Sequence, residues 1–107
     1  MTRLNRNHVP IAFVAIFGDE IVGTASLVEY EGSYTSLRPW VSGVFVPERW
    51  RGQGIAKELI SAIESEAQKL GCFCLWLSAS VPDMYLKLGY TFSELYKGEE
   101  PVMFKHI

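Results

Sequence analysis

The sequence predicts an α/β (α+β) domain with one mixed sheet, one long helix and one short helix. Three observations indicate this fold class. The chain has 107 residues, of which 49% are hydrophobic and 21% are charged, which is the composition of one ordinary globular domain. Short runs of β-branched and aromatic residues recur along it, whereas one long segment alone sustains a helical period. The predicted order of elements is β-β-β-α-β-α-β-β.

The first part of the chain predicts a hairpin and a third strand. The apolar run Ile11 to Phe17 is separated from the run Ile21 to Tyr30 by a tight Gly-Asp turn, which is typical of a hairpin. The segment Glu31 to Pro39 is rich in turn residues and is expected to be a loop. Trp40 to Val46 is β-branched and aromatic, and Pro47 ends this strand because proline cannot donate to a ladder.

The long helix is predicted from Ile55 to Leu70. Its apolar residues recur at helical spacing and therefore share one face. They are Ile55, Leu59, Ile60, Ile63, Ala67 and Leu70. Gly71 stands where a glycine commonly ends a helix. The helix is thus expected to cover the sheet with this apolar face.

The last part of the chain predicts a buried strand, a short helix and a final hairpin. Cys72 to Leu77 is almost continuously apolar, which suggests a strand buried on both faces. Pro82 to Leu88 has an early proline and a following glycine, as short helices do. Two strands, Tyr90 to Tyr96 and Val102 to His106, are expected to be joined by a turn over Lys97 to Pro101.

Composition and charge exclude several classes of protein. There are 10 Lys and Arg against 12 Asp and Glu, so a nucleic-acid binder, which would usually be basic, is not expected. No apolar run approaches the roughly 18 residues of a membrane helix. The segment Met1 to Pro10 is polar and lacks the apolar centre of a secretory signal, so we expect a cytoplasmic protein that binds no membrane.

The two cysteines predict neither a disulfide framework nor a metal site. Cys72 and Cys74 are two apart on an expected strand and would face the same side. The two histidines, His8 and His106, lie near the ends of the chain and offer no nearby ligands. Buried, inert thiols are the expectation, and no metal is expected.

The turn from the third strand into the long helix is the segment that carries chemistry. It reads Val-Phe-Val-Pro-Glu-Arg-Trp-Arg-Gly-Gln-Gly-Ile-Ala from Val44. Gly52 and Gly54 allow a ligand to approach the backbone closely, because glycine has no Cβ. The helix start offers no Ser, Thr, Asp or Asn cap, so its free N–H groups and dipole form an anion site. Arg51 and Lys57 add positive charge at the same end.

The residues of this glycine turn can be compared with three known kinds of strand–helix connection. It could be a structural strand–helix connection without a ligand. A P-loop would need Gly-Lys-Ser/Thr, but Gly54 is followed by Ile55 and Ala56. A dinucleotide fingerprint would need a third glycine where Lys57 stands. Both nucleotide motifs fit poorly, and a generic phosphate binder stays a weak alternative.

The wider pattern resembles the GNAT superfamily of N-acetyltransferases. Arg51 to Ala56 is similar to the signature Q/R-x-x-G-x-G/A of that family, and it follows a strand ending in Val-Phe-Val-Pro-Glu. Met84 to Tyr90 resembles the late Tyr-x-x-Leu-Gly-Phe/Tyr segment, and Val102 to Lys105 resembles the last strand. The resemblance runs from about Ile11 to the end and implies a mixed, mostly antiparallel sheet.

The resemblance implies that acetyl-CoA is the cofactor, with CoA as a product, and that an amine is the substrate. The cofactor would lie where the third strand splays from the Cys72–Leu77 strand. Its pyrophosphate would meet the helix start, and its pantetheine would pair with the third strand as an added strand. The implied cofactor-binding residues are Val44, Phe45, Val46, Arg51, Gly52, Gln53, Gly54, Ile55, Ala56 and Lys57.

The implied reaction is direct attack of a primary amine on the thioester. By resemblance, the backbone N–H of Val46 would stabilise the oxyanion. Tyr85 would act as general acid, or at least as a hydrogen-bond donor, toward the leaving sulfur. A core aromatic without a catalytic role is the alternative for Tyr85. The acceptor could be a small molecule or a peptide.

The general base is not assigned by the sequence. The third strand, where many family members have a glutamate, has no carboxylate here. Glu29, Glu31 and Asp83 are candidates, although each is more simply a solvated surface acid. Water could instead carry the proton away past Ser42. Glu99 and Glu100 are expected to form a solvated turn.

Length suggests a reduced N-terminal half. A usual domain of the resembled family has a strand and two helices before the hairpin, whereas only ten residues precede Ile11 here. The whole chain, residues 1–107, is expected to be one acetyltransferase domain with an open acceptor side or with a second subunit covering it. A homodimer is therefore compatible with the sequence. A non-catalytic module that binds acyl-CoA is the alternative to an enzyme.

Overall fold

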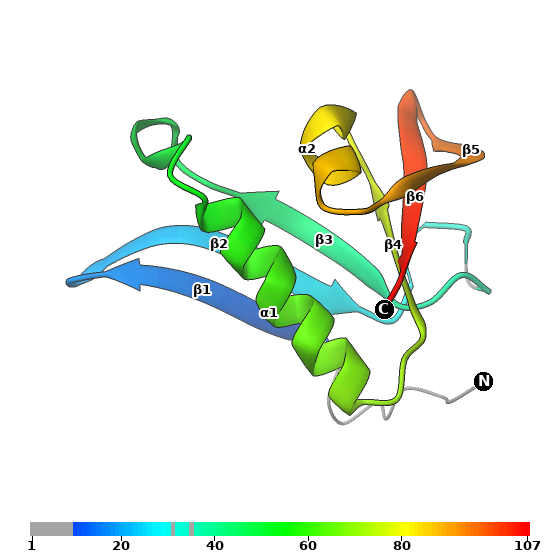
Figure 1. Ribbon diagram of the computed structural model, residues 1–107, viewed down its shortest axis with the longest axis horizontal. Helices are drawn as coiled ribbons and strands as arrows, with labels where there is room; N and C mark the ends of the chain where they lie inside the picture. Colours follow the sequence, from blue (N-terminus) through cyan, green and yellow to red (C-terminus); the bar gives the residue numbers. More distant parts are fainter. Residues whose placement is uncertain (1–9, 31, 35) are drawn as a thin grey trace.

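The computed structural model describes residues 10–30, 32–34 and 36–107 (Figure 1). The polar segment Met1 to Pro10, for which no secretory signal is expected, lies outside the described residues except for Pro10. The described residues form six strands, two α-helices and one short 3-10 helix. Their bounds are β1 Ile11–Phe17, β2 Glu20–Val28, β3 Trp40–Phe45, η1 Glu48–Trp50, α1 Ile55–Lys69, β4 Cys74–Ser78, α2 Pro82–Lys87, β5 Thr91–Lys97 and β6 Glu100–His106.

The strands form one mixed sheet in the order β1-β2-β3-β4-β6-β5. The first three strands are antiparallel neighbours, and so are the last three. The two halves meet at β3 and β4, which run parallel. This arrangement confirms the predicted class and order of elements. It also means that the crossover through α1 joins the two antiparallel halves.

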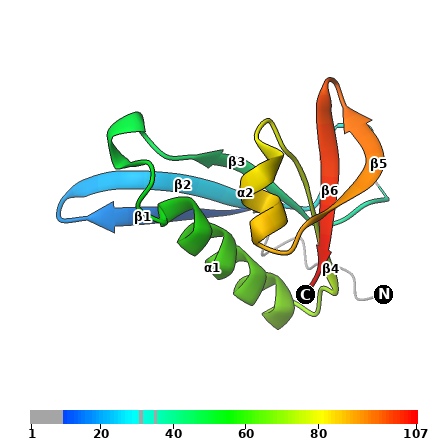
Figure 2. The ribbon, with the colours of Figure 1, turned by 45° about the horizontal axis from the view of Figure 1, so that its top comes forward.

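Helix α1 lies across one face of β1, β2 and β3, and α2 lies on the same side of the sheet (Figures 1 and 2). The predicted apolar face of α1 packs against the sheet, and its residues Leu59, Ile60, Ile63 and Ala67 are all below 5% exposed. The helix approaches β2 closely at Gly23. A Cβ on Gly23 would lie 2.8 Å from Ile55 Cγ2 and 3.0 Å from Leu59 Cδ1, so the packing needs glycine there.

The prediction for β4 was partly wrong. Leu75 and Leu77 are fully buried in the core, but Trp76 on the opposite face is only partly buried and packs on Phe104 at 5.1 Å between ring centroids. The strand is therefore buried mainly on its helix side. Cys72 precedes the strand instead of belonging to it, so the two cysteines do not share a strand face.

The final hairpin is longer and tighter than predicted. The turn expected over Lys97 to Pro101 is a two-residue turn, because Lys97 pairs with Glu100 and Tyr96 pairs with Pro101. Strand β6 therefore begins at Glu100, and Glu100 belongs to a strand instead of a solvated turn. Among the described residues, no helix is long and apolar enough to cross a membrane.

Candidate active site

The site begins where β3 and β4 separate. Among the described residues, the two parallel strands are paired only at Trp40 and Trp76, and Trp76 N–H donates to the Pro39 carbonyl at 3.0 Å. Beyond this point β3 runs on for five residues and β4 for two. In Figures 1 and 2 the two strands diverge toward their carboxyl ends. The backbone of late β3 is thus left facing an opening, as the resemblance implied.

A bulge in β3 turns its last residues. Ser26 of β2 pairs with Ser42, whereas Thr24 pairs with Phe45, so β3 carries one extra residue between these positions. Gly43 lies in this bulge with φ +62°, a conformation that side-chain-bearing residues avoid. A Cβ there would meet no heavy atom within 4 Å, so the backbone conformation alone requires glycine.

The glycine turn leaves the start of α1 uncapped, as predicted. Gly54 is the N-cap residue with φ +81°, and no side chain bonds to the free N–H groups of the first turn. The first bond of the helix runs from Glu58 N–H to the Gly54 carbonyl at 3.0 Å. The N–H groups of Ile55, Ala56 and Lys57 precede it and have no acceptor within the helix. They form a donor set suited to phosphate oxygens.

Two side chains beside the turn hold it against the rest of the molecule. Arg51 Nε donates to the Val46 carbonyl at 2.8 Å, which ties the end of β3 to the glycine turn. The Trp50 ring packs on Phe17 at 5.4 Å, and Trp50 Nε1 donates to the Glu20 carboxylate at 3.2 Å. The hairpin β1–β2 therefore braces this end of the site.

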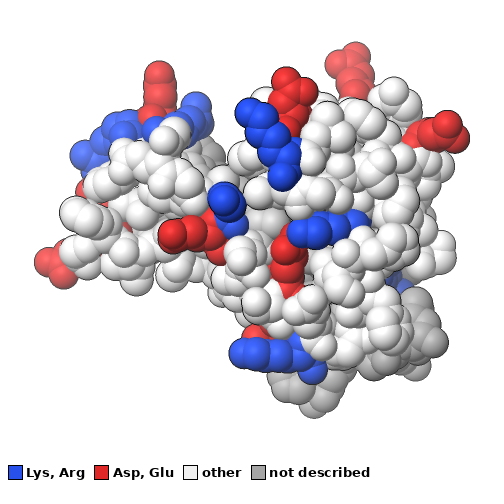
Figure 3. Space-filling model, viewed as in Figure 1, with Lys and Arg blue, Asp and Glu red and all other residues white. Residues whose placement is uncertain are grey.

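These elements enclose a cleft of about 840 Å³, within the usual range for ligand sites. Figure 3 shows the surface indented between η1 and α2, with Lys and Arg side chains gathered on the η1 side. Of the predicted cofactor-binding residues, nine line the cleft: Val44, Phe45, Val46, Arg51, Gly52, Gly54, Ile55, Ala56 and Lys57. Gln53 is exposed and does not line it.

Tyr85 lines the same cleft from α2 and is 8% exposed. Its ring meets the Tyr90 ring edge to face at 5.9 Å, so its body belongs to the core. Among the described residues, no hydrogen bond to its hydroxyl is found. Burial raises the pKa of Tyr85, and the negative charge of Glu100 raises it further. The hydroxyl is therefore protonated at neutral pH and can donate into the cleft.

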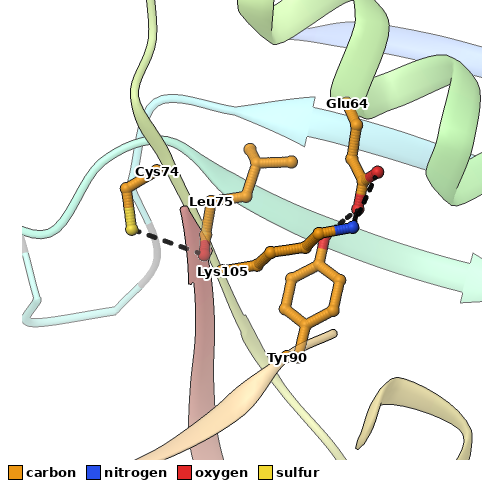
Figure 4. Close-up of polar contacts among 5 residues, drawn as sticks. All are labelled: Glu64, Cys74, Leu75, Tyr90 and Lys105. Atoms are coloured by element: carbon orange, nitrogen blue, oxygen red, sulfur yellow. Dashed lines mark hydrogen bonds and ion pairs between the residues drawn. The ribbon is translucent and has the colours of Figure 1, made fainter. Parts of the chain in front are cut away.

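Glu64, Tyr90 and Lys105 form a polar cluster (Figure 4), and the Tyr90 ring also contacts Tyr85. Tyr90 Oη donates to Glu64 at 2.9 Å, and Lys105 Nζ lies 3.1 and 3.2 Å from the two oxygens of Glu64. Burial, together with the Glu64 carboxylate, raises the pKa of Tyr90. The cluster joins α1 to β6 and has a structural role, because none of its members lines the cleft.

The cysteines fit the expectation of inert thiols. Cys72 is buried and Cys74 is partly buried, and burial raises the pKa of both thiols. Cys74 Sγ donates weakly to the Leu75 carbonyl at 3.9 Å, as Figure 4 shows. Within the described ranges, no three His, Cys, Asp or Glu side chains come together as a metal site would require.

Of the carboxylates considered as general bases, the two that the structure describes, Glu29 and Asp83, do not line the cleft. Glu29 forms an ion pair with Arg38 at 3.3 Å, and Asp83 is exposed on the outer side of α2. Glu31 lies outside the described residues. Ser42 does line the cleft. Sequence reasoning missed Glu100, which lines the cleft from β6, because the register of the last hairpin was not evident from its turn residues.

The residues of the cleft fit a ligand such as coenzyme A. The free N–H groups at the start of α1, together with Arg51 and Lys57, match a pyrophosphate in both donor chemistry and charge. The backbone of late β3 offers unpaired groups to an extended chain. Fold and site together define an α/β domain whose cleft, between two splayed parallel strands, is suited to a phosphate-bearing ligand.

The chain belongs to the acetyltransferase (GNAT) domain family, whose model matches residues 9–92. It is similar to Acetyltransferase Atu2258 of Agrobacterium fabrum, with 36% identity over 83 residues. These residues are 73% of this chain and 57% of that protein, so the match spans a little over half of the relative.

Several solved structures of acetyltransferases have a similar fold. One is an aminoglycoside 6'-N-acetyltransferase complexed with coenzyme A, with TM-score 0.79, 18% identity, and coverage of 94% of this chain and 74% of that one. Another is the PaiA N-acetyltransferase from Thermoplasma acidophilum in complex with coenzyme A, with TM-score 0.79, 17% identity, and coverage of 95% and 64%. At these identities the likeness shows the fold.

Proposed function

We propose that this protein transfers an acetyl group from acetyl-CoA to a primary amine of a small molecule or peptide. The observation that carries the proposal is the junction of the cleft with the uncapped start of α1. Family membership and the coenzyme A bound by structural neighbours support the same cofactor. When bound, acetyl-CoA would supply a thioester, whose carbonyl carbon accepts the amine and whose sulfur leaves.

The residues of the chain would bind and orient the two reactants. The N–H groups of Ile55, Ala56 and Lys57 would hold the pyrophosphate, with Arg51 and Lys57 adding charge. The bulged backbone of Val44 to Val46 would pair with the pantetheine amides. Val46 follows the last paired residue of β3, so its N–H is the candidate donor to the thioester oxygen.

Tyr85 would hold the proton that the leaving sulfur needs. Tyr85 lines the cleft, and its raised pKa keeps its hydroxyl protonated across the neutral range. A tyrosine with a raised pKa is a weaker acid than a free one, so its main contribution is a hydrogen bond that strengthens as charge develops on sulfur. This role needs the hydroxyl and not the ring.

The test combines a binding assay with a turnover assay. Acetyl-CoA should raise the melting temperature, because a ligand that binds the native state stabilises it by mass action. Release of free thiol should then be measured across polyamines, aminosugars and lysine-containing peptides, with mass detection of the acetylated product. A rise in melting temperature with acetyl-CoA, but no thiol release with any amine, would refute the proposed acetyl transfer. It would instead support a non-catalytic module that binds acyl-CoA.

A further inference from the structure

Glu100 is the one carboxylate among the described residues that line the cleft. The other titratable groups of the lining are Arg51, Lys57, Tyr85 and Lys97. Arg51 and Lys57 belong to the end of the cleft where the anion site lies. Glu100 instead comes from β6, at the end of the cleft that α2 and the last hairpin form. Lys97 lies at this same end, opposite Glu100 in the hairpin, so this end of the cleft has one carboxylate and one ammonium group.

The backbone fixes this position of Glu100. Residues Gly98 and Glu99 form a two-residue turn, which places Glu100 opposite Lys97 as the first residue of β6. The next residue, Pro101, accepts a hydrogen bond at 3.0 Å from the N–H of Ala79, which follows the end of β4. Since α2 begins at Pro82, the same connection brings the start of β6 beside the helix that carries Tyr85.

Glu100 is partly buried, yet it makes no ion pair. Elsewhere in the molecule, Glu20 pairs with Arg49, Glu29 with Arg38 and Glu64 with Lys105. No such partner lies within ion-pair distance of Glu100 among the described residues. Lys97 extends toward the loop at residue 32, where a Cβ would lie 3.8 Å from its Cε. A partly buried carboxylate without an ion-pair partner in a cleft wall is suited to a cationic ligand.

Glu100 and Tyr85 line the same cleft, and they interact electrostatically. The charge of Glu100 is the second cause, after burial, of the raised pKa of Tyr85. The Ala79–Pro101 hydrogen bond brings the start of β6 beside the connection that leads into α2, so the two residues come from adjacent parts of the cleft wall. A nucleophile near Glu100 would also be near the group that assists the leaving sulfur.

We propose that Glu100 binds the ammonium form of the acceptor amine and takes one of its protons, so that the substrates are cationic amines. This inference rests on the proposed acetyl transfer. One N–H bond breaks, its proton moves to a carboxylate oxygen of Glu100 and then to solvent, and nitrogen keeps the electron pair. That pair forms the C–N bond while the C–S bond breaks.

The second proton of the amine nitrogen is balanced by the proton that Tyr85 supplies. The second nitrogen proton leaves as the amide forms and replaces the proton that Tyr85 gives to sulfur. Each turnover of an ammonium substrate therefore yields one amide, one free thiol and one proton in solution. No oxidant, reductant or metal is needed for this balance.

The test compares Glu100→Gln with Glu99→Gln, a matched control in which the neighbouring exposed carboxylate, which does not line the cleft, is changed. With acetyl-CoA and the best amine of the panel, Glu100→Gln should lower kcat/KM by roughly 10²- to 10⁴-fold, the usual range for a positioned base. Its affinity for CoA should stay within about twofold of wild type, since Glu100 lies away from the anion site. Glu99→Gln should behave as wild type.

Several results would overturn the inference. The inference fails if Glu100→Gln turns over at the wild-type rate, or if Glu99→Gln loses as much activity as Glu100→Gln. If wild type acetylates no amine, the proposed function fails. The role of Glu100 in binding a cationic amine is then tested by binding measurements alone. Spermidine added to the CoA complex should raise the melting temperature of wild type and not of Glu100→Gln. An equal shift in both proteins, or none in either, would refute the role of Glu100.

Discussion

The bulge at Gly43 can be tested by a substitution that adds a single methyl group. Gly43→Ala places a Cβ at φ +62°, where an L-residue costs roughly 1–2 kcal/mol. No heavy atom lies within 4 Å of that Cβ, so steric overlap adds nothing. The expected loss of stability is therefore the backbone cost alone, about 4–16 °C in melting temperature for a domain of this size.

Gly18 offers a matched control. It has the same φ of +62° and the same empty surroundings, but it lies in the turn between β1 and β2, outside the cleft. Gly18→Ala should therefore cost the same stability as Gly43→Ala. The two variants should differ in ligand binding, because relaxing the strain at Gly43 would redirect the backbone of Val44 to Val46.

The expected loss of affinity follows from the hydrogen bonds at risk. Misaligning two backbone hydrogen bonds, each worth about 0.5–1.5 kcal/mol, would weaken CoA binding by roughly 5- to 150-fold. Melting curves without ligand and calorimetric titration with CoA measure the two effects separately. The reasoning fails if Gly43→Ala binds CoA as tightly as Gly18→Ala does, or if Gly18→Ala loses affinity to the same degree.

Three further predictions concern other parts of the molecule. Tyr85→Phe should lower turnover by roughly 10- to 10³-fold in the thiol-release assay with little change in melting temperature, and equal turnover would exclude the acid role. Burial raises the pKa of Tyr85 and Tyr90, so the native state keeps protons that unfolded tyrosines lose above about pH 10. The free energy of unfolding should therefore fall as pH rises past that value, and this fall should be smaller in Tyr90→Phe than in wild type. Urea unfolding midpoints at about pH 8.5 and 10.5 measure the fall, and an identical fall in both proteins would contradict the prediction. Gly23→Ala should cost about 1–3 kcal/mol because its Cβ would lie 2.8 Å from Ile55 Cγ2, and an unchanged melting temperature would show that α1 adapts without strain.

Local patterns predicted most of the fold. The apolar period from Ile55 to Leu70 predicted α1 to within one residue at its end, because the residues of a buried helix face recur within one continuous segment. The Gly-Asp turn gave the first hairpin for a similar reason, since turn chemistry depends on neighbouring residues. The glycine turn and the uncapped helix start were predicted from a short stretch and lie as expected.

What the sequence could not give depends on pairing between distant segments. Glycine within a strand is compatible with a bulge, but the extra residue at Gly43 exists only relative to the register of β2. Glu100 was assigned to a solvated turn because it lies between Gly98 and Pro101, which are both turn residues. Its place in the cleft follows from the pairing of β5 with β6 and from the Ala79–Pro101 hydrogen bond.

The cleft and the anion site have a common origin in the β3–α1–β4 unit. A parallel pair requires a crossover, and the crossover helix must start near the carboxyl end of the strand that precedes it. The start of α1, with its free N–H groups, therefore lies at the edge where β3 and β4 diverge. On either side of this junction the sheet is antiparallel, so its other strand pairs lack such a crossover. The one parallel junction thus combines an opening for an extended ligand with donors for its phosphates.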